Sequence, residues 1–316
     1  MIHLAGLTKR FGKVTAVDGL SFTVDEGELF GLVGPDGAGK TTTLRMLAGV
    51  LRPSGGDATI GDVSVARYPE RVKARLAYMS QRFGLYGDLT VAENLHFYAD
   101  LYRVPRAERD ERLERLFEFS GLAPFRGRLA GRLSGGMKQK LGLSCALIHR
   151  PEVLLLDEPT FGVDPVSRRE LWLIVHEMVA EGVTAVVSTA YLDEAERFDR
   201  LALLHQGRLV ALDAPAALQR GFSGEVLEVT LGNPRRGREA AGAIETVRRA
   251  TVFGDRLHLT VDSAEEAAPT VERRLREAGA EPSDLRRVTP VLEDVFIERV
   301  TDQYRGAEPG PHPHQG

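Results

Sequence analysis

A glycine-rich segment behind a short apolar run constrains the fold of this 316-residue chain more than any other feature. The apolar run spans residues 29–33, the segment at 34–42 reads GPDGAGKTT, and a helix-compatible stretch follows at 40–51. This is the G-x-x-x-x-G-K-[ST] pattern in its expected context of strand, loop and helix. At average glycine usage the pattern arises by chance in roughly one chain in a hundred of this size. We therefore predict a phosphate-binding loop.

The residue types in this loop suit a chain of phosphates. Glycines let the backbone curl so that successive N–H groups point inward, and the helix N-terminus adds its dipole. Lys40 supplies a positive charge to the β- and γ-phosphates, and the Thr41 hydroxyl is placed to bind Mg²⁺. The predicted nucleotide-binding residues of the loop are Gly34, Pro35, Asp36, Gly37, Ala38, Gly39, Lys40, Thr41 and Thr42.

A second motif is an apolar run at 153–156 that ends in two acids, Asp157 and Glu158. A buried strand of this kind places its last residues at the carboxyl edge of a sheet, where ligands of open α/β folds bind. There Asp157 can hold Mg²⁺, and Glu158 can polarise a water molecule for in-line attack on the γ-phosphate. Alone, the same residues describe an ordinary strand and turn. Behind a phosphate-binding loop, they indicate a catalytic site.

The third motif is LSGGM at 133–137, between the other two. Ser134 can cap a helix that carries on one face Met137, Leu141, Cys145 and Ile148. The simplest interpretation of these residues is a capped helix with a glycine hinge. The order of the three motifs along the chain is what indicates a more specific role.

Strand-like and helix-like stretches alternate over residues 1–220. Further buried strands are expected at 153–156 and 183–187, with a helix at 168–179 between them. This alternation of strands and helices predicts an α/β fold with a mostly parallel sheet and helices on its faces. The strand signal vanishes at about 85–150, which predicts a helical subdomain inserted into the α/β core.

The character of the sequence changes after Gly221. Strands are expected at 225–231 and 247–261, the latter turning at Gly254, with helices around Glu239 and at 264–278. A β-α-β-β-α-β order fits a small ferredoxin-like domain. We therefore predict a nucleotide-binding domain at 1–220, an accessory α/β domain at 221–303 and a disordered tail at 304–316.

Composition sets limits on partners and location. The chain is 43% hydrophobic and 27% charged with a net charge of −4, which argues against a nucleic-acid binder that works through bulk charge. No apolar run approaches the roughly 18 to 20 residues of a membrane helix, and no signal peptide is expected at the N-terminus. The single cysteine, Cys145, suits a reducing cytosol and is expected in the core.

The order of a phosphate-binding loop, LSGG and an apolar strand ending in Asp-Glu-Pro-Thr resembles the ATPases of ABC transporters, over nearly all of residues 1–220. The resemblance implies that two ATP molecules are sandwiched in a dimer, with Ser134, Gly135 and Gly136 contacting the γ-phosphate bound by the other subunit. It also implies three further roles. Phe11 matches the aromatic residue that stacks on adenine, although it could equally belong to the core. Gln81 matches the glutamine that reaches the metal and the attacking water. Asp164 matches the loop that communicates across the dimer.

One position departs from the family pattern. These ATPases usually carry a histidine after the strand that follows the Asp-Glu pair, and here Ala190 stands in its place. Neither His176 nor His205 is expected to substitute for it. The missing contact to the γ-phosphate puts the turnover rate of this site in doubt.

Two longer stretches, at 81–86 and 164–172, narrow the resemblance to ABC-2 type exporter ATPases of the daunorubicin-resistance class, and especially to the first half of a tandem ATPase. The segment at 289–296 resembles the closing helix of that class, with Thr289 as cap and Val291, Leu292, Val295 and Phe296 buried.

This class implies an ATPase subunit with ATP and Mg²⁺ as cofactors, an ABC-2 type transmembrane permease as partner and a second ATP-binding subunit, identical or different. It implies a cytoplasmic protein that lies peripherally on the cell membrane through the permease. Two alternatives stay open: an ATP-gated regulatory subunit with little turnover, because of Ala190, and a non-transport ABC ATPase. An importer is less favoured because the C-terminal extension indicates export.

Overall fold

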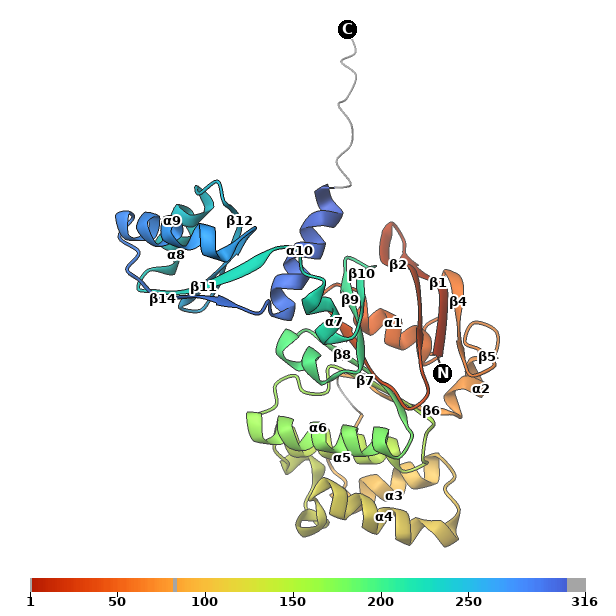
Figure 1. The fold of residues 1–316 in the computed structure, drawn as a ribbon. Helices are drawn as coiled ribbons and strands as arrows, with labels where there is room; N and C mark the ends of the chain where they lie inside the picture. The colour runs from red at the N-terminus through yellow and green to blue at the C-terminus, as the bar shows by residue number, and fades with distance from the viewer. Residues whose placement is uncertain (1, 82–83, 306–316) are drawn as a thin grey trace. The chain divides into compact units, whose positions relative to one another are not determined.

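The computed structural model describes residues 2–81 and 84–305 of the protein. The chain (Figure 1) divides into two compact units, with the division between Pro215 and Ala216 in the sequence. We call them unit 1 and unit 2 and describe each by itself. The boundary predicted at residue 220 falls at the end of helix α7 (Pro215–Arg220). That each unit folds as an independent domain remains a prediction.

The centre of unit 1 is a six-stranded sheet in the order β10-β9-β3-β8-β7-β6. All neighbouring strands in it run parallel except β9 and β10. This confirms the predicted α/β class with a mostly parallel sheet. The strands are β3 (Leu29–Val33), β6 (Leu76–Met79), β7 (Val153–Asp157), β8 (Thr184–Thr189), β9 (Arg200–His205) and β10 (Arg208–Asp213).

Every residue of β3, β7 and β8 is buried. Strands covered on both faces read as continuous apolar runs, which is why the sequence located these three strands. Helix α1 (Lys40–Leu47) follows the loop after β3 but ends four residues before the predicted limit of 51. Gly49, with φ at 65°, terminates it because glycine adopts the left-handed conformation readily.

A second, antiparallel sheet in unit 1 was not predicted. It has the order β2-β1-β4-β5, and its strands alternate buried and exposed residues rather than forming apolar runs. Its buried side chains join α1 and the parallel sheet in one core. The strands are β1 (Ile2–Phe11), β2 (Val14–Val24), β4 (Gly55–Ile60) and β5 (Val63–Ser64), and helix α2 (Pro69–Lys73) follows them.

Helices occupy the predicted insertion and gather at the end of unit 1 away from β1 and β2 (Figure 1). Helix α3 begins at Val91 because Thr90 and Glu93 form a reciprocal capping box there. Asp164 caps α6 by accepting from two backbone N–H groups. The helices of the insertion are α3 (Val91–Leu101), α4 (Arg106–Ser120), α5 (Gly135–Leu147) and the 3₁₀ turns η1 (Ala123–Phe125) and η2 (Ala130–Arg132). Helix α6 (Pro165–Ala180) and the 3₁₀ turn η3 (Leu192–Arg197) come after it in the chain.

Unit 2 has the predicted β-α-β-β-α-β order and an antiparallel sheet in the order β12-β13-β11-β14. The side chains Leu227, Leu257, Leu259, Val271 and Leu275 form its core between the sheet and two helices. The elements are β11 (Glu225–Leu231), α8 (Pro234–Gly242), β12 (Val247–Phe253), β13 (Arg256–Val261), α9 (Ala264–Glu277) and β14 (Pro282–Val288).

The last helix, α10 (Leu292–Arg305), corrects two expectations. It begins after Thr289 and Pro290, and the Asp294 carboxylate, rather than Thr289, accepts from a backbone N–H at its start, that of Val291. Val291 is exposed and Phe296 only half-buried, whereas Leu292 is buried as expected. The helix includes residues 304 and 305, which were predicted to be disordered. The rest of the predicted tail, 306–316, lies outside the described residues.

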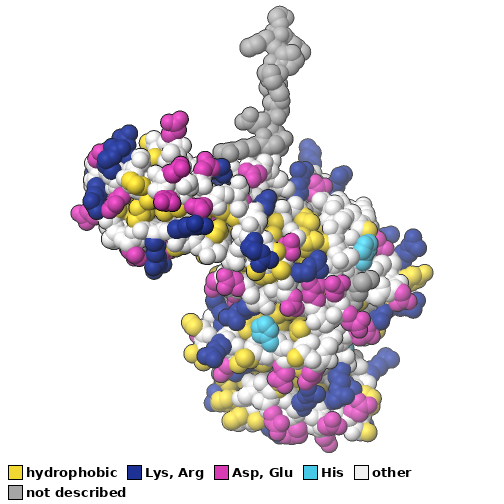
Figure 2. All heavy atoms as spheres, in the orientation of Figure 1, with side chains coloured by type: hydrophobic (Ala, Val, Ile, Leu, Met, Phe, Trp, Pro, Cys, Tyr) yellow, Lys and Arg dark blue, Asp and Glu magenta, His cyan; other side chains and the backbone are white. Residues whose placement is uncertain are grey.

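No helix within residues 2–81 and 84–305 combines the length and the apolar character that crossing a membrane requires. On the face drawn in Figure 2, basic and acidic side chains are interspersed rather than gathered by sign.

A buried charge network joins the sheet of unit 2 to α10. His258 on β13 bonds to the Asp294 carboxylate through Nδ1 (3.0 Å) and to Glu228 through Nε2 (3.3 Å). Arg286 and Arg256 also bond to Glu228, at 2.7 and 3.1 Å. Burial is the largest influence on the pKa of His258 and lowers it, but Asp294 and Glu228 together outweigh burial, so the pKa is raised. Burial likewise raises the pKa of Glu228, but Arg286, His258 and Arg256 outweigh it and lower that pKa to about 2.

These shifts predict how the stability of unit 2 depends on pH. A histidine whose pKa is raised by folding stabilises fully below its unfolded value of about 6.5 and loses that contribution as pH rises through the folded pKa. A glutamate whose pKa is lowered stabilises above about 4.3 and loses its contribution as pH falls toward 2. We expect His258→Gln to lower the free energy of unfolding by about 1–3 kcal/mol at pH 6 and by less at pH 9.

Calorimetry of the unit 2 transition between pH 5 and 9 measures this effect, with His96→Gln, at an exposed position, as control. An equal loss of stability at both ends of the range would contradict the assignment of His258.

Candidate functional site

A cavity of about 640 Å³ opens over the loop between β3 and α1. Its wall comes from three parts of unit 1: the start of β2, the loop itself, and the ends of strands of the parallel sheet. Seven predicted loop residues line it, together with two predicted catalytic residues. The lining residues are Val14, Thr15, Ala16, Asp36, Gly37, Ala38, Gly39, Lys40, Thr41, Thr42, Gln81, Glu158 and Gln206.

Glycine is required at particular positions of the loop. A Cβ atom on Gly34 would lie 2.2 Å from the Leu204 carbonyl oxygen, closer than any side chain permits. Gly39 caps α1 with φ at 101°, a conformation that disfavours other residues. The loop therefore lies close to β9 while its backbone curls into α1, as a phosphate cradle requires.

Lys40 is 4% exposed and is held over this loop. Its Nζ donates to the carbonyl oxygens of Gly34 (2.7 Å) and Pro35 (3.2 Å) and lies 3.2 Å from Glu158 Oε1. These contacts put a cation between the loop and the end of β7. A triphosphate bound there would lie within reach of that charge.

Asp157, at the end of β7, is 1% exposed and accepts three hydrogen bonds. Thr41 Oγ1 and Ser188 Oγ donate to Oδ1 at 2.9 and 2.8 Å, and Tyr78 Oη donates to Oδ2 at 3.3 Å. Burial, followed by the Asp157 charge, raises the pKa of Tyr78 to about 12, so its hydroxyl remains a donor at neutral pH. Thus three elements, α1, β6 and β8, hold the carboxylate that β7 carries.

Sequence analysis missed Ser188 and Tyr78. Each lies near the carboxyl end of a strand next to β7, and this placement is the signal that could have found them. Parallel neighbours bring their carboxyl ends to one edge of the sheet, so polar residues there converge.

Glu158 has φ at 48°, in the left-handed region. For a residue other than glycine this conformation costs about 1–3 kcal/mol and persists only where neighbouring contacts impose it. Its N–H donates to Ser188 Oγ at 2.9 Å, and its carboxylate accepts from Gln81 Nε2 at 3.0 Å. The two predicted catalytic residues are therefore in direct contact, and Glu158 faces the cavity.

The arrangement fits a nucleotide-bound Mg²⁺ ion better than a metal held by protein alone. Within the described ranges, no group of three or more His, Cys, Asp or Glu side chains could hold a metal ion. Mg²⁺ commonly takes one or two protein oxygens and fills its other positions with phosphate and water. The adjacent oxygens of Thr41 and Asp157 suit that mode. Gln81, the third predicted ligand, lines the same cavity.

Phe11 is not among the residues that line the cavity. Its side chain is 50% exposed at the end of β1, with Lys9 Nζ 5.1 Å from the ring centre. This exposure rules out the alternative of a core residue. Val14, opposite Phe11 in the β1–β2 pair, forms the cavity wall on that side. The role of Phe11 toward adenine remains a prediction.

The LSGG residues do not line the cavity either. Ser134 caps α5 by accepting from the Met137 N–H at 3.3 Å, as predicted. Gly136 packs so closely against Ser167 on α6 that a Cβ atom would lie 2.3 Å from that side chain. Ser134 and Gly135 are exposed, while Gly136 is buried. Within one chain these residues belong to the junction of α5 and α6.

Ala190 follows β8 directly and is exposed. The preceding residue, Thr189, accepts from the Gly34 N–H through its carbonyl oxygen at 3.3 Å. Position 190 therefore lies next to the start of the phosphate-binding loop, where a methyl group offers no hydrogen bond.

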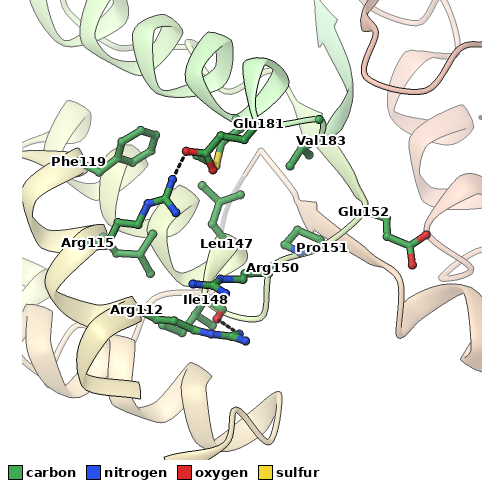
Figure 3. Close-up of a pocket in the computed structure, with 13 residues that line it drawn as sticks. Arg112, Arg115, Phe119, Leu147, Ile148, Arg150, Pro151, Glu152, Glu181 and Val183 are labelled. Atoms are coloured by element: carbon green, nitrogen blue, oxygen red, sulfur yellow. Dashed lines mark hydrogen bonds and ion pairs between the residues drawn. The ribbon is translucent and has the colours of Figure 1, made fainter. Parts of the chain in front are cut away.

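A second cavity, of about 290 Å³, lies among the ends of α4, α5 and α6 (Figure 3). Leu147 and Met178 contribute to its apolar lining. The charged side chains at its rim are partnered locally: Arg115 with Glu181, and Arg112 with the Ile148 carbonyl oxygen at 3.0 Å. We assign the functional site to the first cavity because the phosphate-binding loop, the Asp-Glu pair and Gln81 converge there.

The chain is similar to several known proteins. The sequence model of the ABC transporter family matches residues 17–161. The chain is 45% identical to the probable multidrug ABC transporter ATP-binding protein YbhF of Escherichia coli (strain K12) over 305 residues. That match covers 94% of this chain but 52% of YbhF, so the chain spans about half the length of this relative.

Two further similarities extend over most of this chain and most of the protein that it matches. The chain is 35% identical over 301 residues to the daunorubicin resistance ATP-binding protein DrrA2 of Streptomyces coeruleorubidus, covering 94% of each protein. A solved structure of an ATP-binding subunit of an ABC transporter is 31% identical, with a TM-score of 0.64, and covers 70% of this chain and 92% of that one.

Proposed function

Since the chain belongs to the family of ABC transporter ATP-binding proteins, we propose that it is the ATP-binding and ATP-hydrolysing subunit of an ABC-2 type export complex. The observation that carries the proposal is the convergence at one sheet edge of a phosphate-binding loop, a buried carboxylate and a second carboxylate in contact with Lys40 and Gln81.

The proposed roles follow from the contacts. Lys40 and the loop N–H groups bind the β- and γ-phosphates, and Thr41 and Asp157 hold Mg²⁺, which neutralises phosphate charge when bound. Glu158 orients and deprotonates the attacking water, and Gln81 positions Glu158 through the 3.0 Å hydrogen bond between them.

A second ATP-binding subunit is part of the proposal. Ser134 and Gly135 are exposed at the start of α5 and do not line the chain's own cavity, which supports their contacting a nucleotide bound by another subunit. The N-terminus of α5 favours negative charge, and Ser134 adds a hydroxyl donor. Asp164, the cap of the adjacent α6, would then lie near that contact.

A transmembrane permease is also part of the proposal, and the helical insertion offers a surface on which it could dock. Exposed apolar side chains gather on and around α3, where the Tyr86 and Phe97 rings meet edge to face with centroids 4.6 Å apart. Leu101 is exposed on the same helix. This surface begins five residues after Gln81, so a membrane partner docked there would sense changes at the site. In this proposal the chain is cytoplasmic and reaches the membrane through the permease.

Export is favoured by two of the relatives. YbhF is described as a probable multidrug transporter protein and DrrA2 as a daunorubicin resistance protein, and both matches include unit 2. The transported substrate is not part of the proposal.

A second candidate is an ATP-gated subunit with little turnover. The observation that favours it is Ala190, which places no hydrogen-bond donor beside the phosphate-binding loop. A non-transport ATPase is less well supported, because both relatives are named as transporter or resistance proteins.

Glu158→Gln tests the hydrolytic role. We expect ATP binding to be retained while hydrolysis stops, because the amide keeps the shape of the side chain but cannot act as a base. An ATP-bound dimer should then persist on size exclusion. Glu70→Gln, at an exposed residue, is the control and should hydrolyse at the wild-type rate. Wild-type hydrolysis by Glu158→Gln would show that Glu158 does not activate water.

Ala190→His distinguishes the two candidates. Restoring one preorganised donor to a developing charge is worth about 10²–10³ in rate in the best-studied hydrolase case. We expect a higher ATPase rate without tighter ATP binding, measured alone and with a candidate second subunit. Ala180→His, at an exposed position of α6, is the matched control. An unchanged rate, or a wild-type protein that is already fast, would count against a slow site.

A further inference from the structure

Glu194 is a buried carboxylate to which no role has so far been assigned. It lies on η3, is 2% exposed, and accepts three hydrogen bonds from side chains. Thr189 Oγ1 and Thr160 Oγ1 donate to Oε2 at 2.8 and 3.1 Å, and Trp172 Nε1 donates to Oε1 at 3.3 Å. A buried charge is costly unless it is well hydrogen-bonded, so this set of donors is a built arrangement.

Two of these donors belong to segments that form the nucleotide site. Thr160 lies two residues after Glu158. Thr189 is the last residue of β8, directly before Ala190, and its carbonyl oxygen accepts from the Gly34 N–H of the phosphate-binding loop. One carboxylate oxygen therefore joins the segment after β7 to the segment after β8.

The hydroxyl of Thr189 has a second bond. It accepts from the Tyr191 N–H at 3.0 Å while it donates to Glu194. The bond from the Tyr191 N–H to the Thr189 hydroxyl spans Ala190 and so fixes the turn around this position. Removing Glu194 would free the hydroxyl to rotate and loosen this turn.

The hydrogen bonds of Glu194 bear on catalysis because they help to hold the backbone of Glu158. Its left-handed backbone conformation is unfavourable and needs contacts on both sides to persist. Ser188 holds it on one side by accepting from its N–H, and the Thr160–Glu194 bond anchors the chain two residues later.

We propose that Glu194 is a positioning residue for ATP hydrolysis, which fixes the Glu158 turn and the residue 190 turn relative to the phosphate-binding loop. This inference rests on the proposed ATPase function. Glu194 does not line the nucleotide cavity and does not touch the reacting atoms. Its effect is exerted through Thr160 and Thr189.

The carboxylate is the group that suits this place, because all three partners are donors. A glutamine would keep one acceptor oxygen but would present its NH₂ group to a donor on the other side. Arg168 Nε lies 3.8 Å from Glu194 Oε1 and adds a favourable opposite charge, which a glutamine would also lose.

The experiment compares Glu194→Ala and Glu194→Gln with the wild type, full length, in kcat and in ATP affinity. We expect kcat to fall about tenfold or more in Glu194→Ala, since small misplacements of catalytic groups cost up to about 10² in rate. In Glu194→Gln the fall in kcat should be smaller, and the ATP affinity of both variants should change by less than about twofold. A fall in affinity that matches the fall in kcat, or an unchanged kcat, would overturn the proposal.

Met178→Ala is the control for stability. It truncates a buried side chain of α6 and leaves every donor to Glu194 in place. We expect a lower melting temperature with kcat retained. If Met178→Ala lowers kcat as much as Glu194→Ala does, general destabilisation explains the effect and the positioning role is wrong.

A readout that does not depend on activity separates this inference from the proposed function. Amide hydrogen exchange should rise in Glu194→Ala at 158–163 and 188–191 while the exchange of unit 2 stays unchanged. A wild-type protein that does not hydrolyse ATP would refute the proposed function, yet the exchange result would still decide whether Glu194 fixes these turns. Unchanged exchange at both segments would overturn the inference.

Discussion

The hydrogen bonding of the buried Asp157 carboxylate is the interaction on which the rest of the site depends. Thr41 from α1, Ser188 from β8 and Tyr78 from β6 all donate to it, so the carboxylate aligns the phosphate-binding loop with the edge of the parallel sheet. Glu158, the next residue, is then presented to the cavity in a strained conformation. This conformation persists because Ser188 is hydrogen-bonded to both acids and because Glu194 accepts from Thr160 in the turn that follows them.

The sequence predicted those parts of the structure that rest on local signals. The strands around the phosphate-binding loop and the Asp-Glu pair are buried on both faces and appear as apolar runs, so β3, β7 and β8 were located to within two residues at either end. Glycines with positive φ and the Ser134 cap also have local causes. The β-α-β-β-α-β order of unit 2 followed from alternation and turns in the same way.

Features that depend on contacts distant in sequence could not be predicted. Tyr78, Ser188 and Glu194 act through partners up to 79 residues away, and nothing near them in the sequence reveals those partners. The antiparallel sheet of β1, β2 and β4 has half-exposed strands, whose alternation is a weaker signal than an apolar run. The start of α10 was misplaced because the side chain of Asp294 binds the Val291 N–H and His258 at once.

The most direct test of this account is the affinity for ATP with and without Mg²⁺, measured by calorimetry on the wild type and on Asp157→Asn. If Asp157 and Thr41 hold the nucleotide-bound ion, Mg²⁺ should strengthen ATP binding by the wild type, and most of that gain should be lost in the variant. Binding without Mg²⁺ should differ little between the two proteins. An equal gain from Mg²⁺ in both would contradict the account, because Asp157 would then have no part in holding the metal.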